Sequence, residues 1–247
     1  MSFSYNAVWE DTLRLLRQHA PLLAAIAGVF LFMPALLFAV FMPPPVPPQG
    51  GNPERALQMV FDFYRAAAPW FLVQALFTMV GTLAMLRLVF ARDTVGGALV
   101  QGLVLLPFYF LLSLICGFLL FFAFLLLLVP GLYLLGRLAP ISAVLAAENR
   151  RNPFDAIGRT FALTKGNGWA IFGLIFVVGI VAAIAVGVAN TLFGLVFVLA
   201  AGQALGKLLA AVVASALNAA LATLLTMLYA AIYRALAGKA SVAAAFE

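Results

Sequence analysis

The chain has 247 residues, of which 66% are hydrophobic and only 9% are charged, and its formal net charge is +6. A soluble domain is about half apolar and about a quarter charged, so this composition excludes an ordinary water-soluble protein and predicts a polytopic integral membrane protein. No polar stretch is long enough to build a second, water-soluble core. We therefore expect a single membrane domain over residues 1–247.

The residue types limit the chemistry that the chain can carry. Cys116 is the only cysteine and His19 the only histidine, so an internal disulfide and a cysteine-based metal cluster are excluded, and we expect neither a metal nor a cofactor. The basic residues gather at the ends of apolar segments, where anionic headgroups attract them, and no base-stacking platform is visible. We therefore expect membrane lipids, and no nucleic acid, as partners.

Six apolar segments approach the roughly 20 residues that an α-helix needs to cross a bilayer. The predicted fold is all-α, a transmembrane bundle of about six helices with short interfacial amphipathic helices. The fourth segment is the shortest and contains a charged residue. The predicted spans are Leu22–Met42, Trp70–Phe90, Leu103–Leu128, Gly131–Ala147, Trp169–Ala189 and Leu208–Tyr233.

Lysine and arginine are distributed unevenly between the two sides of these spans. Cytoplasmic loops of membrane proteins carry the excess of positive charge, so we expect both termini in the cytoplasm. The outer side then keeps only Arg55, Arg65 and Lys207. The inner side collects Arg14, Arg17, Arg87, Arg92, Arg150, Arg151, Arg159, Lys165, Arg234 and Lys239.

Four segments outside or between the spans carry predictions of their own. The outer loop Pro43–Arg55 is rich in proline and is expected to be an extended spacer. Ala56–Ala68 has the pattern of an amphipathic helix that could lie on the outer surface. Pro130-Gly131 is expected to form a tight outer turn. The apolar stretch Asn190–Leu205 extends the fifth helix, kinks it or lies at the outer interface, and the pattern does not choose among these.

The inner segment Arg150–Trp169 has the signals of a short helix with defined ends. Asn152 suits the N-cap and Pro153 the first helical position, and Gly166 suits the end of the helix. We expect it to lie flat on the inner leaflet and to anchor the fifth span, and headgroup or partner recognition is the alternative. Phe154, Ile157 and Phe161 form its apolar stripe, and the interfacial candidates are Glu148, Arg150, Arg151, Arg159 and Trp169.

The run from the third to the fifth span resembles a bacterial family. An apolar run is followed by Pro-Gly, a span with an internal arginine, an acidic residue, a short helix and Leu-Thr-x-Gly-Asn-x-Trp. This pattern is similar to the membrane domain attached to some glycerophosphodiester phosphodiesterases and to its stand-alone relatives of the YciC type. The matching positions are Pro130, Gly131, Arg137, Glu148, Ala156, Arg159, Leu163, Thr164, Gly166, Asn167 and Trp169.

The resemblance implies a polytopic protein of the bacterial cytoplasmic membrane. It does not imply phosphodiesterase activity here, because the catalytic domain of such enzymes is a soluble barrel with paired histidines and a carboxylate-bound metal. The chain has no room for that barrel, and His19 alone cannot supply the pair. We therefore expect no catalytic residues and no enzymatic activity.

Arg137 is the only charged side chain that we place deep inside a predicted span. An ionisable residue at that depth is costly, and the predicted spans contain no acidic residue to pair with it. Its guanidinium either binds backbone carbonyls, for example those freed near Pro140, or contacts a lipid phosphate, which its planar fork suits. Glu148 is expected to pair with an arginine at the inner interface.

The last span carries a polar stripe on one face. Small and hydroxylic residues of this kind serve helix packing, and a polar path or a headgroup groove is the alternative. A ladder of small residues on the fifth span, Gly179, Ala183 and Gly187, predicts helix packing within the chain or between copies in a homo-oligomer. The stripe consists of Ser215, Asn218, Thr226, Tyr229 and Tyr233.

Three functions remain open on these residues. The first is a non-enzymatic membrane protein that binds or organises phospholipid in membrane homeostasis, with Arg137 as the lipid-phosphate candidate. The second is a transporter or permease for a small or amphipathic solute, lined by the polar stripe of the last span. The third is a membrane subunit or scaffold for an unknown partner protein.

Overall fold

A computed structural model describes residues 3–43, 45, 52–91 and 94–244. Side chains are described only for those residues up to position 238. The described residues form helices and no strand, which confirms the predicted all-α fold. Most of the proline-rich spacer predicted at Pro43–Arg55 lies outside the described residues.

The first predicted span is the second half of a longer helix. α1 (Tyr5–Ala27), the π-helical turn η1 (Gly28–Phe32) and α2 (Met33–Phe41) follow one another without a gap. Pro34 stands in the first turn of α2. Its ring nitrogen has no hydrogen to donate to the preceding turn, which accounts for the widened turn just before it.

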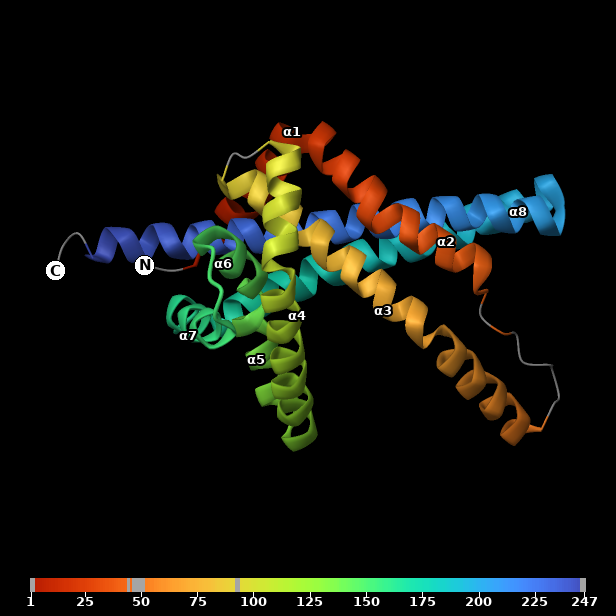
Figure 1. The fold of residues 1–247 in the computed structure, drawn as a ribbon, viewed down its shortest axis with the longest axis horizontal. Helices are drawn as coiled ribbons and strands as arrows, with labels where there is room; N and C mark the ends of the chain where they lie inside the picture. The colour runs from red at the N-terminus through yellow and green to blue at the C-terminus, as the bar shows by residue number, and fades with distance from the viewer. Residues whose placement is uncertain (1–2, 44, 46–51, 92–93, 245–247) are drawn as a thin grey trace.

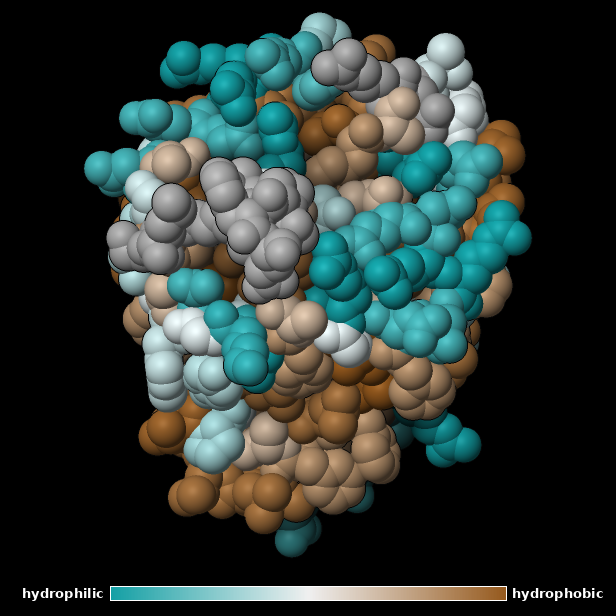
Figure 2. Space-filling view, turned by 90° about the vertical axis from the view of Figure 1, so that its left-hand side faces the viewer, coloured by the Kyte–Doolittle hydropathy of each residue, from teal (hydrophilic) through white to brown (hydrophobic). Residues whose placement is uncertain are grey.

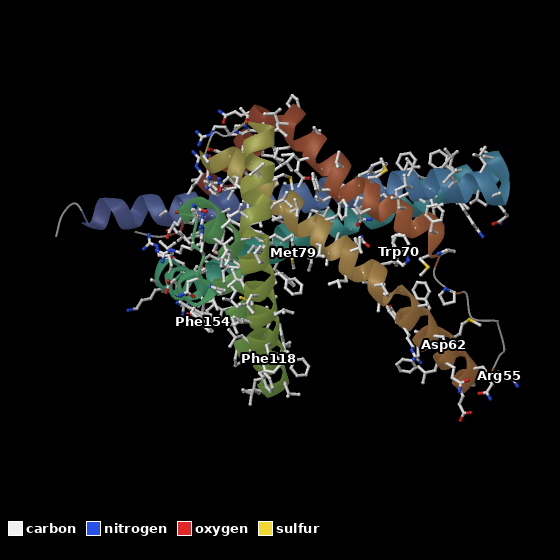
Figure 3. All side chains as sticks on the ribbon, in the orientation of Figure 1. Arg55, Asp62, Trp70, Met79, Phe118 and Phe154 are labelled. Atoms are coloured by element: carbon white, nitrogen blue, oxygen red, sulfur yellow. The ribbon has the colours of Figure 1, made fainter. Side chains whose placement is uncertain are left out.

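α3 (Pro53–Ala91) is one continuous helix of 39 residues. At 1.5 Å per residue it is about 58 Å long, well beyond the roughly 30 Å of a hydrocarbon core. The separate surface helix predicted at Ala56–Ala68 is wrong, because this segment continues the spanning helix as a projecting arm (Figure 1). Arg55 and Asp62 lie near the free end of the arm (Figure 3).

The hairpin between the third and fourth spans turns earlier than predicted. α4 (Val95–Leu126) ends at Leu127, which has an extended backbone with φ −161° and ψ 145°. Pro130-Gly131 lies inside the first turn of α5 (Leu128–Leu138) rather than forming the turn. A helix accepts proline there because the first backbone N–H groups have no partner within the helix. α6 (Ile141–Glu148) follows after a break at Pro140.

α7 (Pro153–Leu163) has the predicted ends. The side chain of Asn152 accepts a hydrogen bond from the backbone N–H of Phe154 at 3.0 Å, and Gly166 has a φ of +79°. The residues of the predicted apolar stripe have different surroundings, because Phe154 is 69% exposed whereas Ile157 and Phe161 pack partly against the core. The face that packs into the protein consists of Pro153, Ala156, Thr160 and Leu163.

α8 (Gly168–Ala244) is two helices that reverse direction at Gly202. This residue has φ 78° and ψ 178°, a conformation that is essentially restricted to glycine. Gly206 then lies so close to the other arm that an added Cβ would be 2.6 Å from the Cα of Val198. The stretch Asn190–Leu205 therefore extends the first arm and turns the chain back, as the hairpin in Figure 1 shows.

Five helical segments of the described chain are long and apolar enough to cross a membrane. The last of them, Gly168–Gly238, contains both arms of α8, which correspond to the predicted spans Trp169–Ala189 and Leu208–Tyr233. Many large apolar side chains on these helices are exposed, including Phe118 at 68% and Leu126 at 78%. Such extensive apolar surfaces mark contact with lipid, so these are the helices of a membrane protein.

The helices converge at one end and spread apart at the other (Figure 1). The α4–α5 hairpin, the α3 arm and the α8 hairpin point in different directions from this end, where α6 packs against α3 and α7. Fully buried residues from several helices pack there, among them Leu15, Leu83, Leu145 and Leu228. Hydrophilic residues gather on the outside of this end (Figure 2), and we call it the polar end.

Candidate functional site at the polar end

The carboxylate of Glu148 lies at the centre of the polar end. It accepts a hydrogen bond from Nε of Arg150 at 2.7 Å and another from Nε of Arg159 at 2.9 Å. The hydroxyl of Tyr233 donates to the same carboxylate at 3.2 Å. One acidic group therefore holds the end of α6, the turn after it, α7 and the second arm of α8 together. The prediction that Glu148 pairs with a nearby arginine is confirmed.

The turn between α6 and α7 places these side chains on one side. Asn149 adopts the left-handed conformation, with φ 49° and ψ 41°, and ends α6. Asparagine tolerates this conformation better than most residues other than glycine. The chain folds back, so the backbone N–H of Arg150 donates to the carbonyl of Leu145 at 3.2 Å. Arg150 can then reach Glu148 only two residues away.

Two further arginines link α3 and α8 to this end. Nη1 of Arg87 on α3 donates to the backbone carbonyl of Ala146 at 3.1 Å, where the carbonyl end of α6 attracts a cation. Nε of Arg234 on α8 lies 3.5 Å from the carboxylate of Asp11 on α1, which also pairs with Arg14. Helices that are far apart in sequence are thus held at the same end by charged contacts.

The guanidinium of Arg137 forms hydrogen bonds with polar groups of the protein. Its Nη2 donates to the backbone carbonyl of Phe161, and its Nε donates to the hydroxyl of Thr164 at 3.3 Å. The guanidinium also lies 4.5 Å from the centre of the Phe161 ring. Of the two roles predicted from the sequence, the structure supports binding to a carbonyl, and the carbonyl comes from α7 rather than from the region of Pro140.

A close crossing of α5 and α8 positions Arg137. An added Cβ at Gly136 would lie 2.7 Å from the Cβ of Phe172, and one at Gly168 would lie 2.9 Å from Cγ of Arg137. Trp169 follows directly, and its ring centre is 5.6 Å from that of Tyr133 on α5. The side chain of Arg137 therefore lies beside the first turn of α8.

The polar stripe of the last span does not face one common surface. Ser215 and Thr226 are buried, whereas Asn218 is exposed. Asn218 donates to the carbonyl of Ala214 and the hydroxyl of Thr226 to the carbonyl of Ala222, both on their own helix. Of the five, Tyr233 belongs to the Glu148 cluster, and Tyr229 is half-buried nearby. This arrangement serves helix packing, and it does not support a solute path lined by the stripe.

The positive charges at the polar end exceed the negative ones. Glu148 carries one negative charge between two arginine partners, whose side chains are 35% and 36% exposed and therefore partly open to solvent. Arg151 and Lys165 are exposed at the two ends of α7. Arginine donates two parallel hydrogen bonds to a phosphate, so the surface can attract and orient anionic groups.

Two of these contacts were not predicted from the sequence. The bond between Tyr233 and Glu148 joins residues that are 85 positions apart, and the pair of Arg234 with Asp11 joins residues near the two ends of the chain. The predicted topology could have indicated both contacts, because all four residues fall at the inner ends of helices. Residues at the same level of a bundle can meet irrespective of their separation in sequence.

Comparisons of the chain with protein-family models, curated proteins and solved structures give no match. The resemblance to the membrane domain of glycerophosphodiester phosphodiesterases stays a prediction, and the site has to be interpreted from its own geometry.

Proposed function

We propose that the protein is a non-enzymatic membrane protein that binds and organises anionic phospholipid around α7 at its polar end. The charge of this region is the observation that carries the proposal. The segment from Arg137 to Lys165 contains five basic and two acidic residues, a net charge of +3. A basic surface beside apolar helices attracts anionic headgroups, by about 1 kcal/mol for each lysine or arginine near the membrane surface.

The start of α7 combines a phosphate-binding group with an apolar one. Phe154 is 69% exposed, and Arg151 precedes it by three residues and is exposed too. Figure 3 shows Phe154 on α7, where the helices converge. An exposed aromatic ring enters the boundary between headgroups and acyl chains, and a neighbouring arginine meets the phosphates there. This pairing supports contact with a lipid surface.

We also propose a cellular location and a membrane orientation for the protein. We propose a multi-pass protein of the bacterial cytoplasmic membrane with both termini in the cytoplasm, because the excess of lysine and arginine then faces the anionic inner leaflet. Glu148, Arg150 and Arg159 hold α7 on the helix ends, and Arg137 supports it from α5. These residues fix the surface, and Arg151 and Lys165 supply the free charges.

The lipids that surround the protein test this function. Protein extracted in polymer-bounded nanodiscs from vesicles of phosphatidylglycerol and phosphatidylcholine should be enriched in phosphatidylglycerol, measured by mass spectrometry of the lipids. The double variant Arg151→Gln/Lys165→Gln should lose about half of that enrichment or more, since it removes two of the unpaired charges.

The matched control is Arg55→Gln/Arg65→Gln, which removes two exposed charges from the α3 arm. It should keep the enrichment at the wild-type level. Equal enrichment in both double variants would contradict a lipid site at α7.

A further inference from the structure

A cavity of about 440 Å³ lies between the middle of α1, the last turn of α3 and the second arm of α8, apart from the α7 surface. Its volume is within the roughly 300–1,000 Å³ of sites that bind small molecules. The cavity has one polar wall and one apolar wall. It is lined by Leu15, Gln18, His19, Val89, Phe90 and Arg234.

The polar wall offers donors for an anion. Arg234 is 42% exposed, and in the described part of the chain its single charged contact is Nε with Asp11 at 3.5 Å. Its two outer nitrogens are therefore available to the cavity. Asp11 is shared with Arg14, so this carboxylate does not cancel the charge of both arginines. Gln18 and His19 add further hydrogen-bonding groups from the same turn of α1.

The apolar wall indicates which anion fits. Leu15 is buried, and Val89 and Phe90 close the α3 side. A free inorganic anion gains nothing from such a wall, whereas a phosphate that carries glycerol and acyl groups can place them against it. Anionic phospholipid is also the phosphate source at the surface of a membrane.

We propose that this cavity binds the phosphate of an anionic phospholipid headgroup, held by Arg234 and His19, with the apolar part of the lipid against Val89 and Phe90. The inference rests on the proposed function and adds a second site, in a partly open cavity on a different set of helices.

Native mass spectrometry of the full chain in mild detergent tests the proposal. Phosphatidylglycerol is titrated against phosphatidylcholine with the same acyl chains. Arg234→Gln should weaken the tightest phosphatidylglycerol binding by roughly tenfold or more, the loss expected for a charge-assisted hydrogen bond. His19→Asn should also weaken phosphatidylglycerol binding. This variant replaces Arg234→Gln in the test if Arg234→Gln does not fold.

The matched control is Arg17→Gln, which removes an exposed charge from the same part of α1 but not from the cavity lining. It should leave the tightest binding within about twofold of the wild type. Equal binding by Arg234→Gln and Arg17→Gln would overturn the proposal.

Competition with inorganic phosphate distinguishes the two sources of the phosphate group. Displacement of the lipid by millimolar phosphate shows that the cavity recognises the phosphate alone, and resistance to displacement shows that it recognises the whole lipid. Loss of lipid in Arg151→Gln/Lys165→Gln but not in Arg234→Gln would overturn the proposal that the cavity binds lipid. The proposed function at α7 would remain supported. Unchanged lipid binding in both would overturn both.

Discussion

Replacing Gly136 by alanine should lower the free energy of unfolding by about 1–3 kcal/mol, an overpacking effect at a helix crossing. The added methyl group would meet the backbone carbonyl of Gly168 and would lie 2.9 Å from the backbone nitrogen of Phe172. Backbone atoms cannot move aside as a flexible side chain can, so α5 and α8 would have to separate. Because Arg137 is the next residue, its bonds to α7 would be strained as well.

The matched control for this change is Gly173→Ala, on α8 five residues beyond Gly168. No atom lies within 4 Å of an added Cβ there, and alanine favours a helix over glycine by about 1 kcal/mol. Thermal unfolding in detergent should show a midpoint that is several degrees lower for Gly136→Ala, since about 1 kcal/mol shifts it by about 2–4 °C. A midpoint for Gly136→Ala equal to that of Gly173→Ala would contradict the close crossing.

Replacing Glu148 by glutamine should destabilise the protein by about 1–3 kcal/mol. The change leaves two neighbouring arginines without their shared counter-ion and gives Tyr233 a weaker acceptor. Removing one partner of a fully buried ion pair costs about 3–5 kcal/mol. The expected loss is smaller here because both arginines are about one third exposed and solvent screens their charges.

Glu10→Gln provides the comparison for Glu148→Gln, because it removes the same charge from an exposed position on α1. Its unfolding midpoint should stay within about 1 °C of the wild type, as expected for an exposed charge. High salt should narrow the difference between the two variants only slightly, because the Glu148 contacts are partly buried. If both variants unfold at the same temperature, Glu148 does not hold the polar end together.

Local signals predicted the parts of the fold that depend on neighbouring residues. Asn152, Pro153 and Gly166 mark the ends of α7, and each acts through backbone groups within a few residues. The apolar spans were recognisable because crossing a bilayer needs a long apolar run. The pairing of Glu148 with an arginine at the inner interface was predictable for a similar reason, since Arg150 is only two residues away.

These local signals did not predict how segments that are distant in sequence are arranged in space. Pro130-Gly131 has the composition of a turn, but proline is equally suited to the first turn of a helix, and the actual turn is set by Leu127. The three alternatives for Asn190–Leu205 were separated only by the conformation of Gly202 and the contact of Gly206 with the other arm. The residue pattern of one helix does not determine where the next helix packs.

The partner of Arg137 illustrates the same limit. A charged side chain is costly in an apolar span, so Arg137 was expected to bind a backbone carbonyl or a lipid phosphate. The carbonyl that it binds belongs to Phe161, 24 residues further along the chain. The three-dimensional crossing at Gly136 brings the two together, and no periodicity within either helix encodes that crossing.

Fluorescence quenching at position 154 shows whether anionic phospholipid gathers at the start of α7. Phe154→Cys in a Cys116→Ser background carries a single fluorophore, since Cys116 is the only cysteine. The protein is placed in vesicles of phosphatidylglycerol and phosphatidylcholine in which one lipid or the other is spin-labelled. A second fluorophore position, Phe118 on the exposed side of α4, reports lipid away from the polar end.

At equal mole fractions, spin-labelled phosphatidylglycerol should quench the fluorophore at position 154 more strongly than spin-labelled phosphatidylcholine, because the arginines around α7 concentrate the anionic lipid. The two lipids should quench equally at position 118. Equal quenching at both positions would contradict the claim that this end of the protein binds anionic phospholipid.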